Sequence, residues 1–482
     1  MNMEFENLKL CNFGEVGKGQ ATISLRYVSN KEIAKVLAIK CESTIFDHKI
    51  GENQVSYKGR AECKLIFLDT NGEIQSSSFF TEFSDAISSK VTEGSHLIFK
   101  SIVVDTNHSL SANIVVVNSV VEVSAYAFST NAVSNLCGGV NILTSPKTYC
   151  QSGTIHKCAL DVESQWQLDF EIDSILSCSC FVSLDGCTSD ADVVTATGRG
   201  YLHLACVSHG AIKEKVLSFD VNGQCLCQTA GGTLVAQPTV KNTKLHVEGA
   251  QETTTLFLDV VIGLEIAELT SVTKEIAQDA YSTTHHLELG YEQTSCTKLC
   301  GTMNFVAVTN AQTNGENFVC VALSNVVLTN TVANVKSITC EGVASVVLLY
   351  KGEEYWSQEL EIPFSHTAPV DFANEKCMVM AHACLGDVTA VVNGESVEVV
   401  ATVNVSASCF ETQMVKTLSK AEIGKELPSR SAIEICMAKK GETLWQLGKS
   451  MGVDVDEITA INPELSNPLE KDTKIVLYHK ID

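Results

Sequence analysis

The sequence predicts a mostly β protein: three tandem antiparallel β-rich domains, folded as sandwiches or open barrels, followed by a small C-terminal βααβ domain. Two observations lead to this class. Apolar residues alternate with a period of two in runs such as 343–350 and 397–405, which is typical of half-buried strands. Long helical stripes of apolar residues are scarce before residue 433, after which the spacing becomes helical.

The length and composition predict several folded domains and exclude nucleic acid as a partner. With 482 residues, the chain exceeds what a single hydrophobic core usually supports, so we expect several domains. Its 45% of hydrophobic residues against 19% of charged residues is typical of a folded chain. A formal net charge of -23 repels the phosphate backbone and anionic lipid surfaces. We therefore expect no nucleic-acid partner.

The N-terminus and the apolar segments predict a cytoplasmic protein without an integral membrane segment. Residues 1–9 carry acids where a secretory signal needs a basic region, and no continuous apolar core follows them. The most apolar stretch, 114–123, is short and is interrupted by Asn118 and Ser119.

The cysteines and histidines predict neither a metal site nor any other cofactor. In a cytoplasmic chain of this size, the twenty cysteines are expected to be mostly reduced and buried. The closest pairs lie at 178–180, 225–227 and 296–300, and none has the spacing of a zinc ribbon. His285 and His286 are adjacent in a polar stretch, which is typical of a loop. Since no nucleophile elbow, phosphate-binding loop, HExxH run or dinucleotide fingerprint is present, we expect no catalytic site.

Internal repetition divides the chain. Three glycines, about 140 residues apart, each precede an apolar run, and a phenylalanine follows each glycine at a similar distance. The glycines are Gly59, Gly198 and Gly342, and the phenylalanines are Phe83, Phe219 and Phe364. We interpret these landmarks as three homologous β domains at 1–130, 131–272 and 273–412. The shared glycine is expected to mark a bulge or a close backbone approach.

The C-terminal part follows a different pattern. Residues 413–432 are polar and contain Pro428 followed by serine, so we expect a linker there. Residues 433–482 are expected to form a strand, two helices and a strand. Thr443 can cap the first helix, and Asp454 with Glu457 has the spacing of a capping box for the second.

The run Gly441-Glu-Thr-Leu-Trp445, followed by Asn462-Pro463 and a final strand around Ile475, resembles the LysM module, which usually opens with Gly-Asp-Thr-Leu-Trp. Glu442 replaces the usual Asp, and residues 471–474 stand where a Pro-Gly or Gly-Gln turn is common. These departures weaken the expectation of glycan binding.

A LysM module after three β-rich repeats resembles the SipL-like spore coat morphogenetic proteins of spore-forming Clostridia, which carry SPOCS repeats. The resemblance implies a structural adaptor in the mother-cell cytoplasm, at the forespore surface or in the spore coat. It also implies that the LysM module docks onto a coat morphogenetic ATPase, with other coat proteins and copies of the chain as further partners. The alternative is a LysM protein that binds peptidoglycan or chitin oligosaccharides.

Either partner would occupy a groove between the two loops at the helix ends. The candidate contact residues of this groove are Glu442, Thr443, Leu444, Asn462, Pro463, Glu464 and Leu465. Loops at helix ends expose backbone groups as well as side chains, which favours them as contacts. Trp445 is expected to be structural, as an anchor of the first helix.

Overall fold

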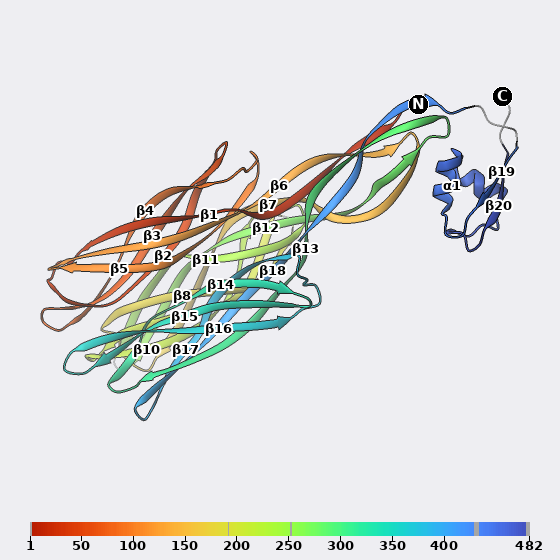
Figure 1. The fold of residues 1–482 in the computed structure, drawn as a ribbon. Helices are drawn as coiled ribbons and strands as arrows, with labels where there is room; N and C mark the ends of the chain where they lie inside the picture. Colours follow the sequence, from red (N-terminus) through yellow and green to blue (C-terminus); the bar gives the residue numbers. More distant parts are fainter. Residues whose placement is uncertain (1, 191, 251–252, 429–432, 479–482) are drawn as a thin grey trace.

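A computed structural model describes residues 2–190, 192–250, 253–428 and 433–478 (Figure 1). The molecule is elongated: a broad β-rich body narrows into a neck of long strands, and the C-terminal module lies at the end of the neck (Figure 1). The predicted fold class is confirmed, because antiparallel strands build the body and a βααβ module follows them. Among the described residues, no helix is both long and apolar enough to cross a lipid bilayer.

The body consists of three units with the same strand pairing. Unit 1 contains β1 (Glu4–Val28), β2 (Ile33–Ile50), β3 (Gln54–Asp69), β4 (Ile74–Ser88), β5 (His96–Ser111) and β6 (Ile114–Gly138). Unit 2 contains β7 (Asn141–Leu168), β8 (Ser174–Asp190), β9 (Val193–Ser208), β10 (Ala211–Leu226), β11 (Thr233–Ala250) and β12 (Thr253–Tyr281). Unit 3 contains β13 (His285–Asn314), β14 (Phe318–Asn334), β15 (Ser337–Lys351), β16 (Tyr355–Pro369), β17 (Cys377–Asn393) and β18 (Ser396–Glu426).

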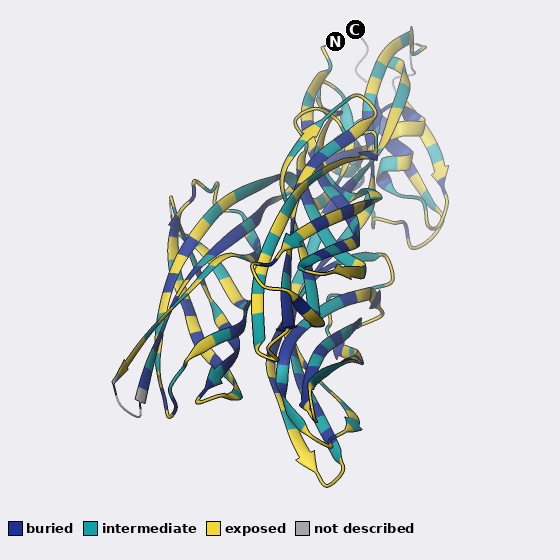
Figure 2. Ribbon diagram, turned by 90° about the vertical axis from the view of Figure 1, so that its left-hand side faces the viewer, coloured by how far each residue is buried: buried dark blue, intermediate teal, exposed yellow. Residues whose placement is uncertain are grey.

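Each unit is a sandwich of two three-stranded antiparallel sheets. The second, third and fourth strands form one sheet, while in the other sheet the sixth strand lies between the first and the fifth. Buried and exposed residues alternate along the strands (Figure 2), as expected for sheets with one face on a core. In unit 1 the core between the two sheets includes Ile23, Tyr57, Leu65, Val117 and Val121.

The units end later than the sequence predicts. The expected boundary at residue 130 falls inside β6, and the boundary at 272 falls inside β12. Residues 413–426, expected to be linker, are the last part of β18 and pair with β13. Polar residues of this strand such as Lys416 and Lys420 are exposed, whereas Val415 and Leu418 are buried. The expected linker residues 429–432 lie outside the described part of the chain.

The neck is formed by the first and last strands of all three units. Each unit contributes one long antiparallel ribbon, β1 with β6, β7 with β12, and β13 with β18. The apolar faces of the ribbons meet in a common core to which each of the six strands contributes: Leu8, Val133, Tyr149, Ile276, Cys296 and Val415. The three units therefore share one core along the neck, in addition to the core inside each sandwich.

Glycine allows an aromatic ring to cover the neighbouring strand. Gly59 lies opposite Phe83, and a Cβ atom at Gly59 would stand 2.5 Å from the Phe83 ring. Gly342 lies opposite Phe364 in the same way, and its added Cβ would stand 2.6 Å from the ring. These positions correspond in units 1 and 3, as the repeat alignment predicts.

Unit 2 departs from this alignment by two residues. Phe219 covers Gly200, whereas the predicted Gly198 lies against the backbone of Ser183. The run Gly198-Arg-Gly200 offers two glycines, so the sequence landmark did not distinguish them. All three predicted glycines nevertheless lie opposite a residue next to a register shift: Ile45, Leu184 and Leu328. The glycines thus stand at β-bulges.

Two pairs of cysteines are bonded, Cys41 with Cys63 and Cys158 with Cys225, and the other sixteen cysteines are free. Cys41 lies directly opposite Cys63 on the adjacent strands β2 and β3. The sequence analysis did not identify these pairs, because separations of 22 and 67 residues carry no local signal.

We expect Gly342→Ala to lower the free energy of unfolding by about 1–3 kcal/mol, as overpacking does. The added methyl group would collide with the Val327 carbonyl, a backbone atom that cannot turn aside, and with the Phe364 ring. Urea unfolding of the full chain measures the effect. Gly352→Ala is the matched control, because no atom lies within 4 Å of its added Cβ. Equal unfolding midpoints for the two variants would contradict the assigned role.

Candidate functional site

The C-terminal module is a two-stranded sheet covered by two helices. Strand β19 (Ile433–Ala438) pairs with β20 (Thr473–Tyr478), and α1 (Leu444–Met451) and α2 (Val455–Ile461) lie between them in the chain. The helices and strands enclose their own small core: Leu444, Leu447, Met451, Ile458, Ile475 and Leu477. The predicted strand–helix–helix–strand order is confirmed.

Thr443 starts α1, as the sequence predicts. Its hydroxyl accepts a hydrogen bond from the Gln446 backbone N–H at 3.2 Å, and the Gln446 side chain accepts one from the Thr443 N–H at 2.9 Å. This reciprocal pair is a capping box. The helix ends at Gly452, which takes the left-handed conformation with φ of 54°. The Thr443 hydroxyl is therefore engaged within the module.

Asp454 starts α2, and Asn462 ends it. The Asp454 carboxylate accepts from the Asp456 N–H at 2.9 Å, but within the described chain no return bond from Glu457 completes the predicted capping box. The Asn462 amide donates to the carbonyls of Ile458 at 2.9 Å and Val476 at 3.0 Å. Asn462 is 5% exposed, so it joins α2 to β20 and presents little surface to the partner that the sequence predicts for it.

Some of the other predicted groove residues are bonded or buried within the module, and the rest are at least partly exposed and free to contact a partner. The Glu442 carboxylate accepts from the Lys439 N–H at 2.8 Å, and Leu444 is buried. Pro463 and Glu464 are exposed, and Leu465 is half-buried beside the module core. The available part of the predicted groove is therefore the turn that follows α2.

The loop before α1 is hydrogen-bonded to the segment that follows the 462–465 loop. The Gly441 N–H donates to the Leu469 carbonyl at 2.8 Å, and the Leu469 N–H donates to the Glu442 carbonyl at 2.9 Å. The Leu444 N–H donates to the Asn467 side chain at 3.1 Å. The 441–444 loop is thus bonded to residues 467–469, which continue the chain beyond the 462–465 loop.

Trp445 anchors the whole module to unit 2. Its indole N–H donates to the Asp279 carboxylate at 3.1 Å, and its ring lies edge-on to Tyr281 with 4.9 Å between ring centres. Lys449 bonds both carboxylate oxygens of Asp279, at 2.6 and 2.7 Å. The Tyr281 hydroxyl donates to the Val453 carbonyl at 2.7 Å. These residues, here named the module contact, place α1 against the end of β12.

The module contact fixes the charge of Asp279. Burial raises the pKa of this carboxyl group, whereas hydrogen bonds from Lys449 and Trp445 lower it. The hydrogen bonds and the Lys449 charge together outweigh burial, so the pKa of Asp279 is below its ordinary value. Asp279 is thus ionised at neutral pH. Burial also raises the pKa of Tyr281 to about 12, so its hydroxyl keeps the proton that it donates.

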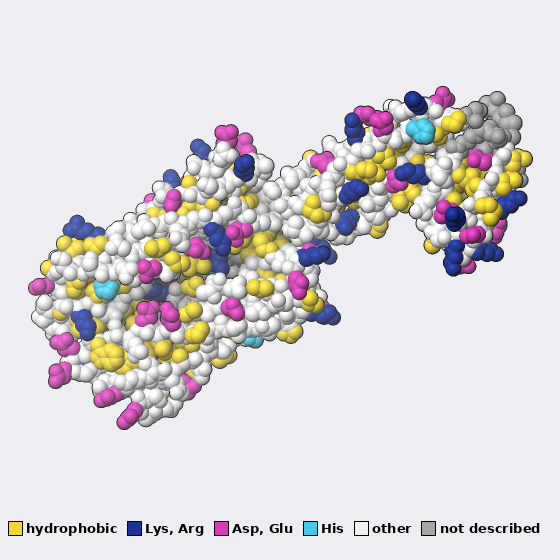
Figure 3. Space-filling model, viewed as in Figure 1, with side chains coloured by type: hydrophobic (Ala, Val, Ile, Leu, Met, Phe, Trp, Pro, Cys, Tyr) yellow, Lys and Arg dark blue, Asp and Glu magenta, His cyan; other side chains and the backbone are white. Residues whose placement is uncertain are grey.

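The outer face of β19 is apolar. Ile433, Ile435 and Met437 point to the same side of the strand at alternate positions, and their exposed fractions are 56%, 56% and 65%. Hydrophobic side chains are visible on the surface of the module in Figure 3. The sequence analysis missed this face, although the alternation Ile-Glu-Ile-Cys-Met carried the signal.

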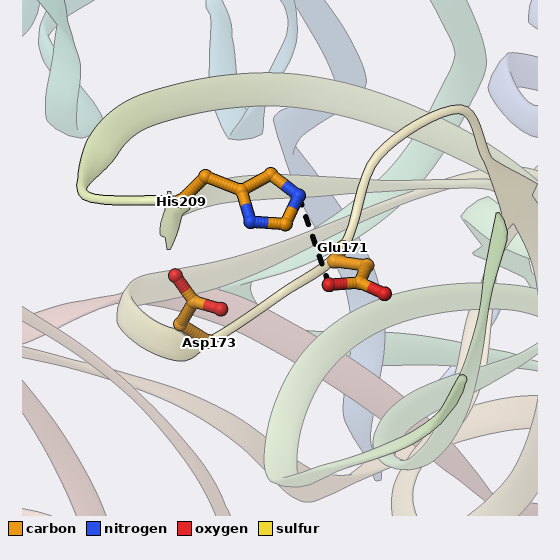
Figure 4. A group of neighbouring side chains, drawn as sticks. All are labelled: Glu171, Asp173 and His209. Carbon is orange, nitrogen blue, oxygen red and sulfur yellow. Dashed lines mark ion pairs between the residues drawn. The ribbon is translucent and has the colours of Figure 1, made fainter. Parts of the chain in front are cut away.

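One group of side chains in the body has the spacing of metal ligands. Glu171, Asp173 and His209 point toward one another from two loops of unit 2 (Figure 4), with ligand atoms within 4.8 Å and His209 Nε2 at 3.7 Å from Glu171. The three side chains are exposed or half-buried. We assign no ion to them, because exposed acidic groups are commonly close together without one.

Comparison with known protein families matches residues 437–474 to the LysM domain. No curated protein and no solved structure matches the chain. The match covers both helices and part of each strand of the module, and it does not extend to the three β units. The expected LysM domain is confirmed, and it suggests a glycan-binding or peptidoglycan-associated role.

We expect Asp279→Asn to loosen the module contact, because the neutral amide cannot pair with the Lys449 ammonium. An Asp whose pKa is lowered in the contact stabilises it above the ordinary value of about 3.9 and stops doing so as pH falls through the lowered pKa. The native contact should therefore persist at neutral pH and weaken below about pH 4.

Fluorine NMR of the chain labelled with 5-fluorotryptophan measures this effect, since the sequence has only 3 tryptophans. The Trp445 resonance should shift in Asp279→Asn at pH 7, and in the native chain only on acidification. Asp259→Asn, at an exposed position of the same strand, is the control. An unchanged Trp445 resonance in Asp279→Asn would contradict the role given to this carboxylate.

Proposed function

We propose that the chain is a non-enzymatic adaptor whose LysM domain docks onto another protein, while the three β units provide the body that holds it. One observation carries this proposal: Ile433, Ile435 and Met437 form an exposed apolar stripe on β19. A stripe of this kind offers well-packed contacts to a protein partner. It has no polar groups for the hydroxyl groups of a sugar.

The hydrogen bonds of the loop before α1 also favour protein docking over glycan binding. Glycan recognition by a LysM groove needs free backbone groups in its loops. In the 441–444 loop, the N–H groups of Gly441 and Leu444 and the carbonyl of Glu442 already have partners inside the module. Satisfied groups gain little from a new hydrogen bond. Protein docking through side chains does not require them.

The class of partner follows from the resemblance to SipL-like proteins. We infer that the LysM domain docks onto a coat morphogenetic ATPase in the mother cell, and that the chain tethers the spore coat to the forespore surface. Other coat proteins and a second copy of the chain are further partners in this proposal. The three repeated units before a LysM domain are the feature that supports it.

Glycan binding is the second candidate, and the LysM match favours it directly. In that case peptidoglycan or chitin fragments would contact the turn after α2, where Pro463 and Glu464 are exposed. The two candidates use different surfaces of the same domain, so variants can separate them.

We expect Ile435→Ser to weaken binding to the coat ATPase at least about tenfold, since it places a hydroxyl in the centre of an apolar contact. Glu464→Lys and Leu465→Ala, at the turn after α2, should weaken this binding less than Ile435→Ser does. Titration of the full chain by calorimetry measures each affinity. Val391→Ser is the control, because Val391 is exposed to a similar degree but lies in unit 3.

The same variants are titrated with chitin and peptidoglycan fragments. Adaptor function predicts little or no binding of these fragments. Micromolar glycan affinity that is lost in Glu464→Lys, is unaffected by Ile435→Ser and occurs without a protein partner would replace the adaptor proposal with the glycan-binding one.

A further inference from the structure

A cavity of about 410 Å³ lies where the three units meet in the body. Its walls come mainly from the second and fifth strands of each unit: β2 and β5, β8 and β11, β14 and β17. In each sandwich these two strands are the edges of the two sheets on one side. The cavity therefore opens where three sandwich edges face one another, and it belongs to no single unit.

About half of the cavity wall is apolar. Side chains from all three units form this part: Ile98, Phe99, Phe181, Leu328 and Met380. Hydroxyl groups interrupt it, and the Ser43 hydroxyl is buried with no hydrogen-bond partner among the described residues. Buried polar atoms in proteins nearly always have a partner, so a free hydroxyl at a cavity wall is a place for a ligand atom.

The charges that line the cavity leave one ammonium group unpaired. Glu42 pairs with Lys40 at 2.7 Å, and Glu265 pairs with Lys157 at 3.1 Å. Within the described chain, Lys100 on β5 has neither an ion pair nor a hydrogen bond.

The surroundings of Lys100 disfavour an isolated charge. Burial and then the nearby Lys18 lower the pKa of Lys100, and the opposing effects of Cys340 and Glu122 are smaller. His382 on β17 is hydrogen-bonded to the Val182 backbone, and burial lowers its pKa to about 4, so it is neutral at pH 7. A partly desolvated ammonium group without a counter-charge is costly, and an anion in the cavity would remove that cost.

We propose that this cavity binds an amphipathic monoanion, a carboxylate or sulfonate with an apolar body. Its charged group would pair with Lys100, and its body would lie against Phe181 of unit 2 and Met380 of unit 3. One unpaired cation beside a wall that is about half apolar fits a singly charged amphiphile better than inorganic phosphate. Because the walls come from three units, the bound anion bridges them. This site is independent of the LysM domain and of the function proposed for it.

The probe is 8-anilinonaphthalene-1-sulfonate, an aromatic sulfonate whose fluorescence rises in apolar surroundings. Titration of the full chain should show saturable binding, displaced by decanoate but not by inorganic phosphate. Lys100→Met should weaken binding at least about tenfold, whereas Lys100→Arg, which keeps the charge, should retain most of it. Lys58→Met is the control, because Lys58 is exposed on unit 1 and does not line the cavity.

A second variant tests the cavity independently, in case Lys100→Met does not fold. Ile102→Trp, two residues from Lys100 on the same face of β5, should narrow the cavity and abolish binding without removing a charge, and decanoate should raise the thermal midpoint of the native chain but not of this variant. Circular dichroism checks that both variants are folded. Native affinity in folded Lys100→Met or Ile102→Trp, or displacement of the probe by phosphate alone, would overturn the proposal.

Discussion

The pairing of the first strand of each unit with its last strand is the constraint on which the rest of the structure depends. These ribbons are longer than the sandwiches need, and they continue past them into the neck. Because their apolar faces share one core, the three units are held in a fixed relation. The cavity in the body and the place where the LysM domain attaches both follow from this arrangement.

The LysM domain is attached by hydrogen bonds, an ion pair and one aromatic contact, and its own core remains separate from the neck. Its contact with β12 consists of one carboxylate, one ammonium group and two aromatic side chains. Such a contact orients the domain without merging it with the body. The apolar stripe on β19 lies on a different element from α1, which makes the contact. A partner could therefore occupy the stripe while the domain stays in place.

Features that depend on residues close together in the sequence are predicted correctly. Contacts between residues far apart in the sequence are not predicted. The period of two in the apolar runs, the cap at Thr443 and the LysM pattern each depend on residues a few positions apart, and the structure agrees with them. The choice between Gly198 and Gly200 depends on which of them faces Phe219 across the sheet. Asp279 and Trp445 are 166 residues apart, and nothing near either residue indicates the other. Burial of Asn462 likewise depends on β20, which comes later in the chain.

The same first-to-last pairing gives the body a high contact order, and this determines when each part can form during synthesis. Strand β1 cannot complete its sheet until β6 has been made, so each unit folds only after nearly all of its residues are available. Domains generally fold from the N-terminus during translation. Asp279 and Tyr281 end unit 2 and precede the whole of unit 3. The LysM domain is made after unit 3, and it therefore meets a binding surface that is already folded.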